Sequence, residues 1–424
     1  MASSGPHGFN PHSFMKSLAR LNLNPISSWI PSSQSALSHG PRRLQLAWAN
    51  SRRPDTHVSI TERQKALETA ETRMLRAIKT PLRKHFVAIP KSRVYGNESI
   101  PGAYYINTIS TTGDPQEQAH KPHLLLVHGW GGGLGIWINN IDELSKHYNV
   151  HAIDLLGWGR SSRPRISGCS PTTIQDWWVE SIEAWRIAQG IDRFTLAGHS
   201  MGGFISASYA ARYGPQHLDK LTLLSPIGIK GFAVPPSQNT REVVRNVIVK
   251  SVWRLTPQRI LSYLSPSRVR DMLLKSRSRV AAQFPYQDDT AIEYVYRLAT
   301  VGNISGETAF TRLMDPTLGW TLPIGEGTIK QFNFPVVFAY GSRDWIDPTW
   351  AATRFGIDKV MGDQAHVYVL PDSGHHGYCE ASKAFVDILL NGEQPEGCRI
   401  APIRTREQLI SEAGDRSKNT LSIA

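Results

Sequence analysis

The stretch FTLAGHSMGGFISASYAAR, residues 194–212, combines a short apolar run with a longer segment of helical periodicity. The run FTLA predicts a buried strand, and residues 203–212 predict a helix. The pentapeptide GHSMG between them places Ser200 at a sharp strand-to-helix turn, where a glycine two residues to either side relieves backbone crowding. Such a turn, called a nucleophile elbow, presents a serine hydroxyl at the carboxyl end of a strand. An ordinary tight turn is the alternative interpretation, which the motifs below disfavour.

Outward from this turn, short apolar runs alternate with amphipathic segments. The fold class predicted by that alternation is α/β, a mainly parallel sheet with helices on both faces. The predicted strands are 103–109, 123–127, 150–154, 194–197, 221–224, 335–340 and 365–370, and the predicted helices are 61–78, 174–189, 203–212 and 382–390. The helix at 61–78 is expected to begin with a capping box formed by Thr61 and Gln64.

The predicted domain boundaries lie where the alternation of strands and helices is interrupted and where it resumes. Residues 226–330 are helical, basic and rich in proline joints, which predicts an insertion between two late strands of one sheet. The expected parts are a basic leader at 1–60, a first core part at 61–225, a helical lid at 226–330, a second core part at 331–395 and a polar tail at 396–424.

Composition excludes several classes of protein. The 424 residues include 40% apolar side chains, which is typical of a globular protein rather than a disordered or collagen-like chain. The three cysteines have no paired spacing, so neither a disulfide framework nor a metal site is expected. No cofactor is expected either. No apolar run reaches the roughly 18 to 20 residues of a transmembrane helix, so any membrane contact is expected to be peripheral.

The net charge of +12 is concentrated in two segments. Residues 1–54 contain six Lys or Arg side chains and no Asp or Glu, a composition typical of an organellar transit peptide. We therefore expect a mitochondrial, membrane-associated protein. The alternative is a basic tail without targeting function, with the protein in the cytoplasm or on lipid droplets.

The second basic segment, residues 241–279, carries ten Lys or Arg against two acids and is interleaved with apolar residues. This pattern favours docking on an anionic membrane surface. A solvated helix face is the alternative, and nucleic acid is disfavoured because no zinc-finger or RNA-binding signature accompanies the charge. The residues assigned to membrane docking are Arg241, Arg245, Lys250, Arg254, Arg259, Arg268 and Arg270.

A glycine-rich turn, HGWGGG at residues 128–133, ends the strand HLLLV. Its Trp130 N–H, together with the N–H of Met201, is predicted to form an oxyanion hole for acyl transfer. A phosphate-binding loop is the rival, but neither nucleotide-binding glycine pattern occurs here. His128 is expected to hold the loop rather than to transfer a proton.

The base and acid that a serine nucleophile needs are predicted at two later strand ends. His375 follows the strand at 365–370 and is the predicted base, with His376 as the nearby alternative. Asp344 follows the strand at 335–340 and is the predicted acid, with Asp347 as the alternative. The chain order Ser, Asp, His is that of hydrolases with this elbow.

Three polar residues follow the strand at 150–154. Asp154 is expected to tie down the glycine-containing loop that comes after it. Arg160 and Arg163 are candidates for facing a polar lipid head group, with a surface role as the alternative.

Seven segments together carry a resemblance to a known family. They are HGWGGGLGIW (128–137), DLLGWGRSSRP (154–164), ESIEAWR (180–186), GHSMGGF (198–204), DDTAIEYVYRL (288–298), SGETAF (305–310) and GHHGYCE (374–380). The chain resembles the α/β-hydrolases of the abhydrolase group, which contains lysophospholipid lipases, a lipase co-activator and the fungal mitochondrial cardiolipin-specific deacylase. The resemblance implies the α/β-hydrolase fold with a lid between strands six and seven, and a phospholipid as substrate and partner.

The resemblance also implies which activities are to be expected. The co-activator has Asn where this chain has Ser200, so a catalytic role is favoured here. The group carries a His-x4-Asp motif linked to lysophosphatidate acyltransferase activity, and this chain has the variant His375 and Glu380. We expect a serine hydrolase of phospholipase A type that deacylates glycerophospholipids, with cardiolipin favoured. The alternatives are a lysophosphatidate acyltransferase or transacylase, and a non-catalytic lipase co-activator scaffold.

Overall fold

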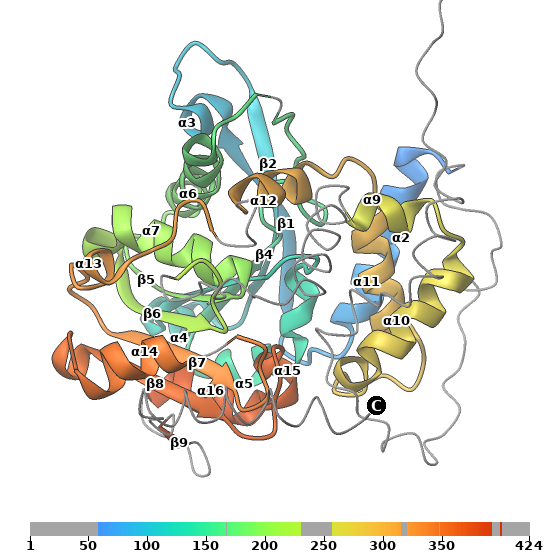
Figure 1. The fold of residues 1–424 in the computed structure, drawn as a ribbon. Coiled ribbons are helices and arrows are strands. Elements are labelled where there is room, and N and C mark those ends of the chain that lie inside the picture. The colour runs from blue at the N-terminus through green and yellow to red at the C-terminus, as the bar shows by residue number, and fades with distance from the viewer. Residues whose placement is uncertain are drawn as a thin grey trace, which may run out of the picture.

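The computed structural model describes residues 58–166, 168–229, 257–314, 320–346, 348–391 and 399–400. At its centre is a nine-stranded sheet in the order β1-β2-β4-β3-β5-β6-β7-β8-β9 (Figure 1). The strands are β1 (Leu82–Pro90), β2 (Ala103–Thr111), β3 (His123–Val127), β4 (Asn149–Ile153), β5 (Phe194–His199), β6 (Leu218–Leu224), β7 (Val336–Gly341), β8 (Ala365–Leu370) and β9 (Arg399–Ile400).

Strands β3 to β8 run parallel, and β1, β2 and β9 add antiparallel edges. Strand β3 lies between β4 and β5, so the chain crosses β3 on its way from β4 to β5. In open parallel sheets, ligands bind beyond the carboxyl ends of the strands at such a change of direction. The predicted mainly parallel sheet is confirmed, and its topology places the end of β3 beside the end of β5.

The sheet is covered on both faces because its central strands alternate between two cores. In β3, Leu125 and Val127 join one apolar cluster, whereas Leu124 and Leu126 join the other. Helices α3, α6 and α7 pack on the first face, and α5 and α16 pack on the second. These helices are α3 (Lys91–Tyr95), α5 (Ile138–Leu144), α6 (Pro171–Ala188), α7 (Met201–His217) and α16 (Ser382–Asn391).

The first described helix, α2 (Ile60–Leu75), begins earlier than predicted. Its capping box consists of Ser59 and Glu62: the Glu62 N–H donates to the Ser59 hydroxyl, and the Ser59 N–H donates to the Glu62 carboxylate. The prediction of Thr61 and Gln64 was wrong because both pairs fit the same four-residue pattern, and the earlier pair supplies a carboxylate at the positive end of the helix.

Five described helices lie between β6 and β7: in chain order, the first three lie together next to α2, the fourth contacts α6 and the fifth contacts α7 (Figure 1). They are α9 (Pro257–Ser262), α10 (Pro266–Ala281), α11 (Thr290–Thr300), α12 (Ser305–Leu313) and α13 (Glu326–Ile329). Helix α11 packs along α2, and Arg73 of α2 pairs with Glu293 of α11 at 2.7 Å. Helix α2 therefore joins the inserted helices to the core.

Four predictions concern the ends of the chain and contact with a membrane. The acid-free residues 1–54 of the predicted leader lie outside the described residues, as do Arg241, Arg245, Lys250 and Arg254. In the tail, where no element was predicted, β9 pairs with β8. Among the helices of the described residues, none has the length and apolar character needed to cross a membrane.

Candidate functional site

Ser200 occupies a strained backbone conformation between β5 and α7, with φ 54° and ψ −115°. The turn is so tight that a Cβ on Gly198 would lie 2.4 Å from the carbonyl oxygen of Gly202. A Cβ on Gly202 would lie 2.5 Å from the carbonyl oxygen of Val127 at the end of β3. Both glycines of the pentapeptide are therefore required sterically, and the sharp turn inferred from the sequence is present.

Ser200, His375 and Asp344 form one hydrogen-bonded line from three different strand ends. The Ser200 hydroxyl oxygen lies 3.0 Å from His375 Nε2, and His375 Nδ1 lies 3.0 Å from Asp344 Oδ1. The Asp344 side chain is fully buried, whereas that of His375 is 14% exposed. A buried carboxylate can hold the imidazole in one tautomer and stabilise the imidazolium that forms when the histidine takes the serine proton.

Of the two alternative residues, the structure describes His376 but not Asp347. His376 is not part of this line: its Nδ1 lies 3.0 Å from the hydroxyl of Tyr378. Asp347 lies outside the described residues. The geometry therefore favours His375 as the base and provides Asp344 as a carboxylate in contact with it.

The glycine-rich loop after β3 lies directly against the elbow. A Cβ on Gly129 would lie 3.0 Å from the Cβ of Ser200, so the backbone leading to Trp130 passes beside Ser200. His128 holds this loop: its Nε2 accepts from the Leu155 N–H at 3.0 Å, and its Nδ1 donates to the Gly129 carbonyl at 2.7 Å. Burial lowers the pKa of His128, which keeps the imidazole neutral and suited to this paired role.

Asp154, at the end of β4, fixes the same loop from the other side. Its Oδ1 accepts from the Leu134 N–H, and its Oδ2 accepts from the Arg160 N–H, each at 2.8 Å. The Asn107 side chain donates to Asp154 at 2.8 Å and to Glu71 at 2.9 Å. The structural role expected for Asp154 agrees with these contacts.

The two arginines that follow β4 are engaged inside the protein. Arg160 pairs with Glu68 and Glu71 of α2, each at 2.8 Å. Arg163 donates to the carbonyl oxygens of Gly159 and Asn303. These contacts bind α2 and the inserted helices to the core, and they argue against the lipid head-group role considered for both arginines.

Glu380, the last residue of the His-x4-Glu variant, contacts the loop that carries His375 and an inserted helix. Its carboxylate accepts from the Gly374 N–H and pairs with Arg279 of α10 at 3.0 Å. The Glu380 side chain is 5% exposed. Its contacts position the loop that carries His375 and link that loop to an inserted helix.

Two side chains beside His375 were not among the predicted site residues. His199 donates from Nε2 to the His375 carbonyl at 2.8 Å. The half-exposed ring of Trp345 lies with its centre 5.0 Å from that of His375. Trp345 had a signal, since it follows Asp344 directly, whereas the contact of His199 depends on the fold of a loop 176 residues away.

The described part of the chain includes three of the predicted docking residues, Arg259, Arg268 and Arg270. Arg268 is exposed on α10, and Arg259 belongs to α9. Arg270 departs from the docking prediction because its guanidinium pairs with Asp289, whose side chain is fully buried, at 2.5 Å. A cation that neutralises a buried carboxylate is held in place by it.

No group of three or more His, Cys, Asp or Glu side chains within the described ranges is arranged to hold a metal ion. The line of three side chains and the glycine-rich loop are instead an arrangement suited to nucleophilic attack on an ester carbonyl.

Comparisons with known proteins agree with this fold. The chain is 32% identical over 328 residues to the (lyso)-N-acylphosphatidylethanolamine lipase of Mus musculus, covering 75% of this chain and 89% of that protein. It is 32% identical over 330 residues to the 1-acylglycerol-3-phosphate O-acyltransferase ABHD5 of Homo sapiens, covering 75% and 87%. The crystal structure of carboxylesterase CesB from Bacillus subtilis shares the fold, with a TM-score of 0.52, 16% identity, and coverage of 78% of this chain and 99% of that one. The model of the α/β hydrolase fold family matches residues 122–382, and the chain belongs to that family, within its branch of phospholipid lipases and acyltransferases.

Proposed function

We propose that this protein is a serine hydrolase that removes a fatty acyl chain from glycerophospholipids. The observation that carries the proposal is the hydrogen-bonded line Ser200, His375 and Asp344 at the point where the sheet changes direction. Two similar proteins, named as a lipase of an acylated phospholipid and an acyltransferase of a phospholipid precursor, support the substrate class.

The proposed reaction has two halves. Ser200 Oγ attacks the ester carbonyl while His375 Nε2 takes its proton, and Asp344 stabilises the resulting imidazolium. The N–H groups of Trp130 and Met201 donate to the oxyanion, where each such donor contributes about 3 to 4 kcal/mol to transition-state stabilisation. The C–O bond of the ester then breaks, and the lysophospholipid leaves with the proton from His375. A water, deprotonated by His375, attacks the acyl-enzyme and releases the fatty acid and free Ser200.

Cardiolipin is the favoured substrate, and the proposed location is mitochondrial and peripheral to a membrane. The acid-free leader at 1–54 and the resemblance to the fungal deacylase support both parts of this proposal. Fusion of residues 1–54 to a fluorescent reporter tests the location. A reporter that stays in the cytosol would contradict mitochondrial import and leave the hydrolase proposal intact.

Acyl transfer is the second candidate activity, and the similarity to an acyltransferase favours considering it. The same acyl-enzyme would then be resolved by the hydroxyl of a lysophospholipid instead of water. Glu380 is held by Gly374 and Arg279, so it has a structural contact that accounts for its burial without a role in transfer.

The decisive experiment uses purified protein and its Ser200→Ala variant on mixed phospholipid vesicles, with lipid species followed by mass spectrometry. We expect serine-dependent release of fatty acid and monolyso-cardiolipin without acyl-CoA. A diacyl product that requires acyl-CoA and lysophosphatidate would replace the hydrolase by an acyltransferase. An unchanged biological effect of the Ser200→Ala variant would favour the scaffold interpretation.

A further inference from the structure

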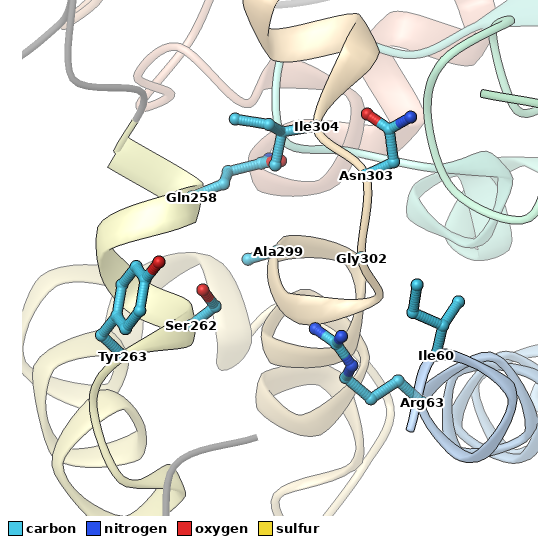
Figure 2. Close-up of a pocket in the computed structure, with 9 residues that line it drawn as sticks. All are labelled: Ile60, Arg63, Gln258, Ser262, Tyr263, Ala299, Gly302, Asn303 and Ile304. Carbon is cyan, nitrogen blue, oxygen red and sulfur yellow. The ribbon is translucent and has the colours of Figure 1, made fainter. Parts of the chain in front are cut away.

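A pocket of about 300 Å³ lies where the start of α2, helix α9 and the end of α11 meet (Figure 2). Its wall includes the guanidinium of Arg63, the amides of Gln258 and Asn303, and the hydroxyl-bearing side chains of Ser262 and Tyr263. No carboxylate is among the described residues that line it. A concave site with one cation, several amides and hydroxyls, and no acid is suited to an anion.

The Arg63 guanidinium has a hydrogen-bond donor that no described residue occupies. Its Nη1 donates to the Thr300 carbonyl at 3.1 Å, which fixes the side chain against the end of α11. Its Nε is buried and has no hydrogen-bond partner among the described residues. Arg63 also lines the pocket, so its guanidinium can meet a ligand there. Arginine matches the oxygens of a phosphate with paired donors.

Gln258 connects the pocket to the proposed oxyanion loop. Its backbone N–H donates to Glu307 at 3.0 Å, and the residue is only 3% exposed, so its position is well defined. Its Nε2 would lie 3.6 Å from a Cβ on Gly131, the residue that follows Trp130. The inner wall of the pocket therefore adjoins the loop that passes Ser200.

The rim of the pocket is apolar. Ile60 is 56% exposed and Tyr263 is 45% exposed, so both side chains offer surface to a ligand that enters from outside. An anion-binding wall with an apolar rim, close to an ester-hydrolysing centre, fits an amphiphile that carries a phosphate.

We propose that this pocket binds the phosphate group of a glycerophosphate ester, with Arg63 as its principal contact. The inference rests on the proposed hydrolase function and adds a specificity determinant to it. The phosphate group is common to free glycerol phosphate and to a lipid, and binding measurements with each of the two separate these sources.

The test compares lysophosphatidate with monoacylglycerol of the same acyl chain, which lacks the phosphate. We expect Arg63→Gln to raise KM for lysophosphatidate by about tenfold or more, as for loss of a hydrogen bond to a charged group, and to leave monoacylglycerol hydrolysis unchanged. Arg63→Lys should recover part of the loss. Arg76→Gln is the matched control, because it removes the same charge from an exposed position at the other end of α2. Equal effects of Arg63→Gln on both substrates, or equal effects of the two variants, would overturn the proposal.

Binding measured by calorimetry separates this inference from the hydrolase proposal. Arg63-dependent binding of glycerol 3-phosphate to the full chain supports the pocket even if no hydrolysis is found. Arg63-dependent binding to lysophosphatidate vesicles but not to glycerol 3-phosphate supports a lipid-borne phosphate. Binding of neither probe, alongside Ser200-dependent hydrolysis, would refute the pocket and keep the hydrolase.

Discussion

Glu380 Oε1 lies 3.0 Å from Arg279 Nε, so the loop that carries His375 is joined to helix α10. The same carboxylate accepts from the Gly374 N–H, one residue before His375. The last residue of the His-x4-Glu variant thus acts on the predicted base through the backbone.

We predict that Glu380→Ala lowers kcat on a soluble ester and leaves KM nearly unchanged, because the position of His375 is loosened. Leaving the Gly374 N–H without an acceptor should also lower the free energy of unfolding by about 1–3 kcal/mol. Steady-state kinetics and urea unfolding measure the two effects. The control is Arg279→Gln, which keeps the contact with Gly374 and should reduce kcat less. If Glu380→Gln instead abolished acyl transfer and spared hydrolysis, Glu380 would have a chemical role.

Asp344→Asn should reduce kcat by about 10³- to 10⁴-fold, because an amide in place of the carboxylate favours the wrong tautomer of His375. The fold should persist, since an amide fills the same space. Asp347→Asn is the matched control and should retain most of the activity. A larger loss from Asp347→Asn than from Asp344→Asn would transfer the acid role to Asp347.

The buried carboxylate of Glu71 predicts a pH-dependent stability. Burial, reinforced by the charge of Asp154, raises the pKa of Glu71 from 4.5 to about 7. The folded state therefore holds a proton that the unfolded state releases between these two values, so the free energy of unfolding falls as pH rises from about 4.5 to about 7. A shift of this size corresponds to roughly 3 kcal/mol.

Thermal unfolding measured between pH 5 and pH 8 checks this prediction. In Glu71→Gln the free energy of unfolding should depend less on pH, because the amide does not titrate. Glu68→Gln is the control, because Glu68 also pairs with Arg160 but its side chain is 56% exposed. In this variant the free energy of unfolding should still fall as pH rises. A decline that persists unchanged in Glu71→Gln would assign the titration to another group.

Replacing Arg241, Arg245, Lys250 and Arg254 together by Gln should lower activity on anionic vesicles by about tenfold or more, since each charge near the surface contributes about 1 kcal/mol of attraction. Activity on a short soluble ester should not change. Equal loss on both substrates would count against docking by this segment.

Arg270→Gln should lower the stability of the protein, unlike the four-residue replacement of Arg241, Arg245, Lys250 and Arg254. It leaves the buried Asp289 without its cation and should lower the free energy of unfolding by about 3 kcal/mol or more. Thermal unfolding distinguishes the two cases, because the four-residue variant should retain the stability of the parent protein.

The order of the elements was accessible from the sequence because it depends on local pattern. The strands 123–127 and 365–370 were predicted with the bounds that the structure has, since their apolar runs end at clear turns. Helix ends were less well placed: α7 extends to His217, through Pro215, because it is packed against β5 and β6. The capping box of α2 was displaced because two overlapping four-residue patterns met the same rule.

Ser200 and His375 were predicted as site residues from spacing and strand ends, because an elbow and strand-end loops have local requirements for glycine and short side chains. By itself the sequence determined the fold class, and it predicted Ser200 as the nucleophile and the order of the three site residues along the chain. Only the tertiary structure decided which carboxylate in the described chain contacts His375, that Glu380 faces α10, and that Arg160, Arg163 and Arg270 are held by internal partners. The physical reason is that a local pattern specifies backbone conformation, whereas an ion pair depends on which distant side chains the packing of helices on the sheet brings together.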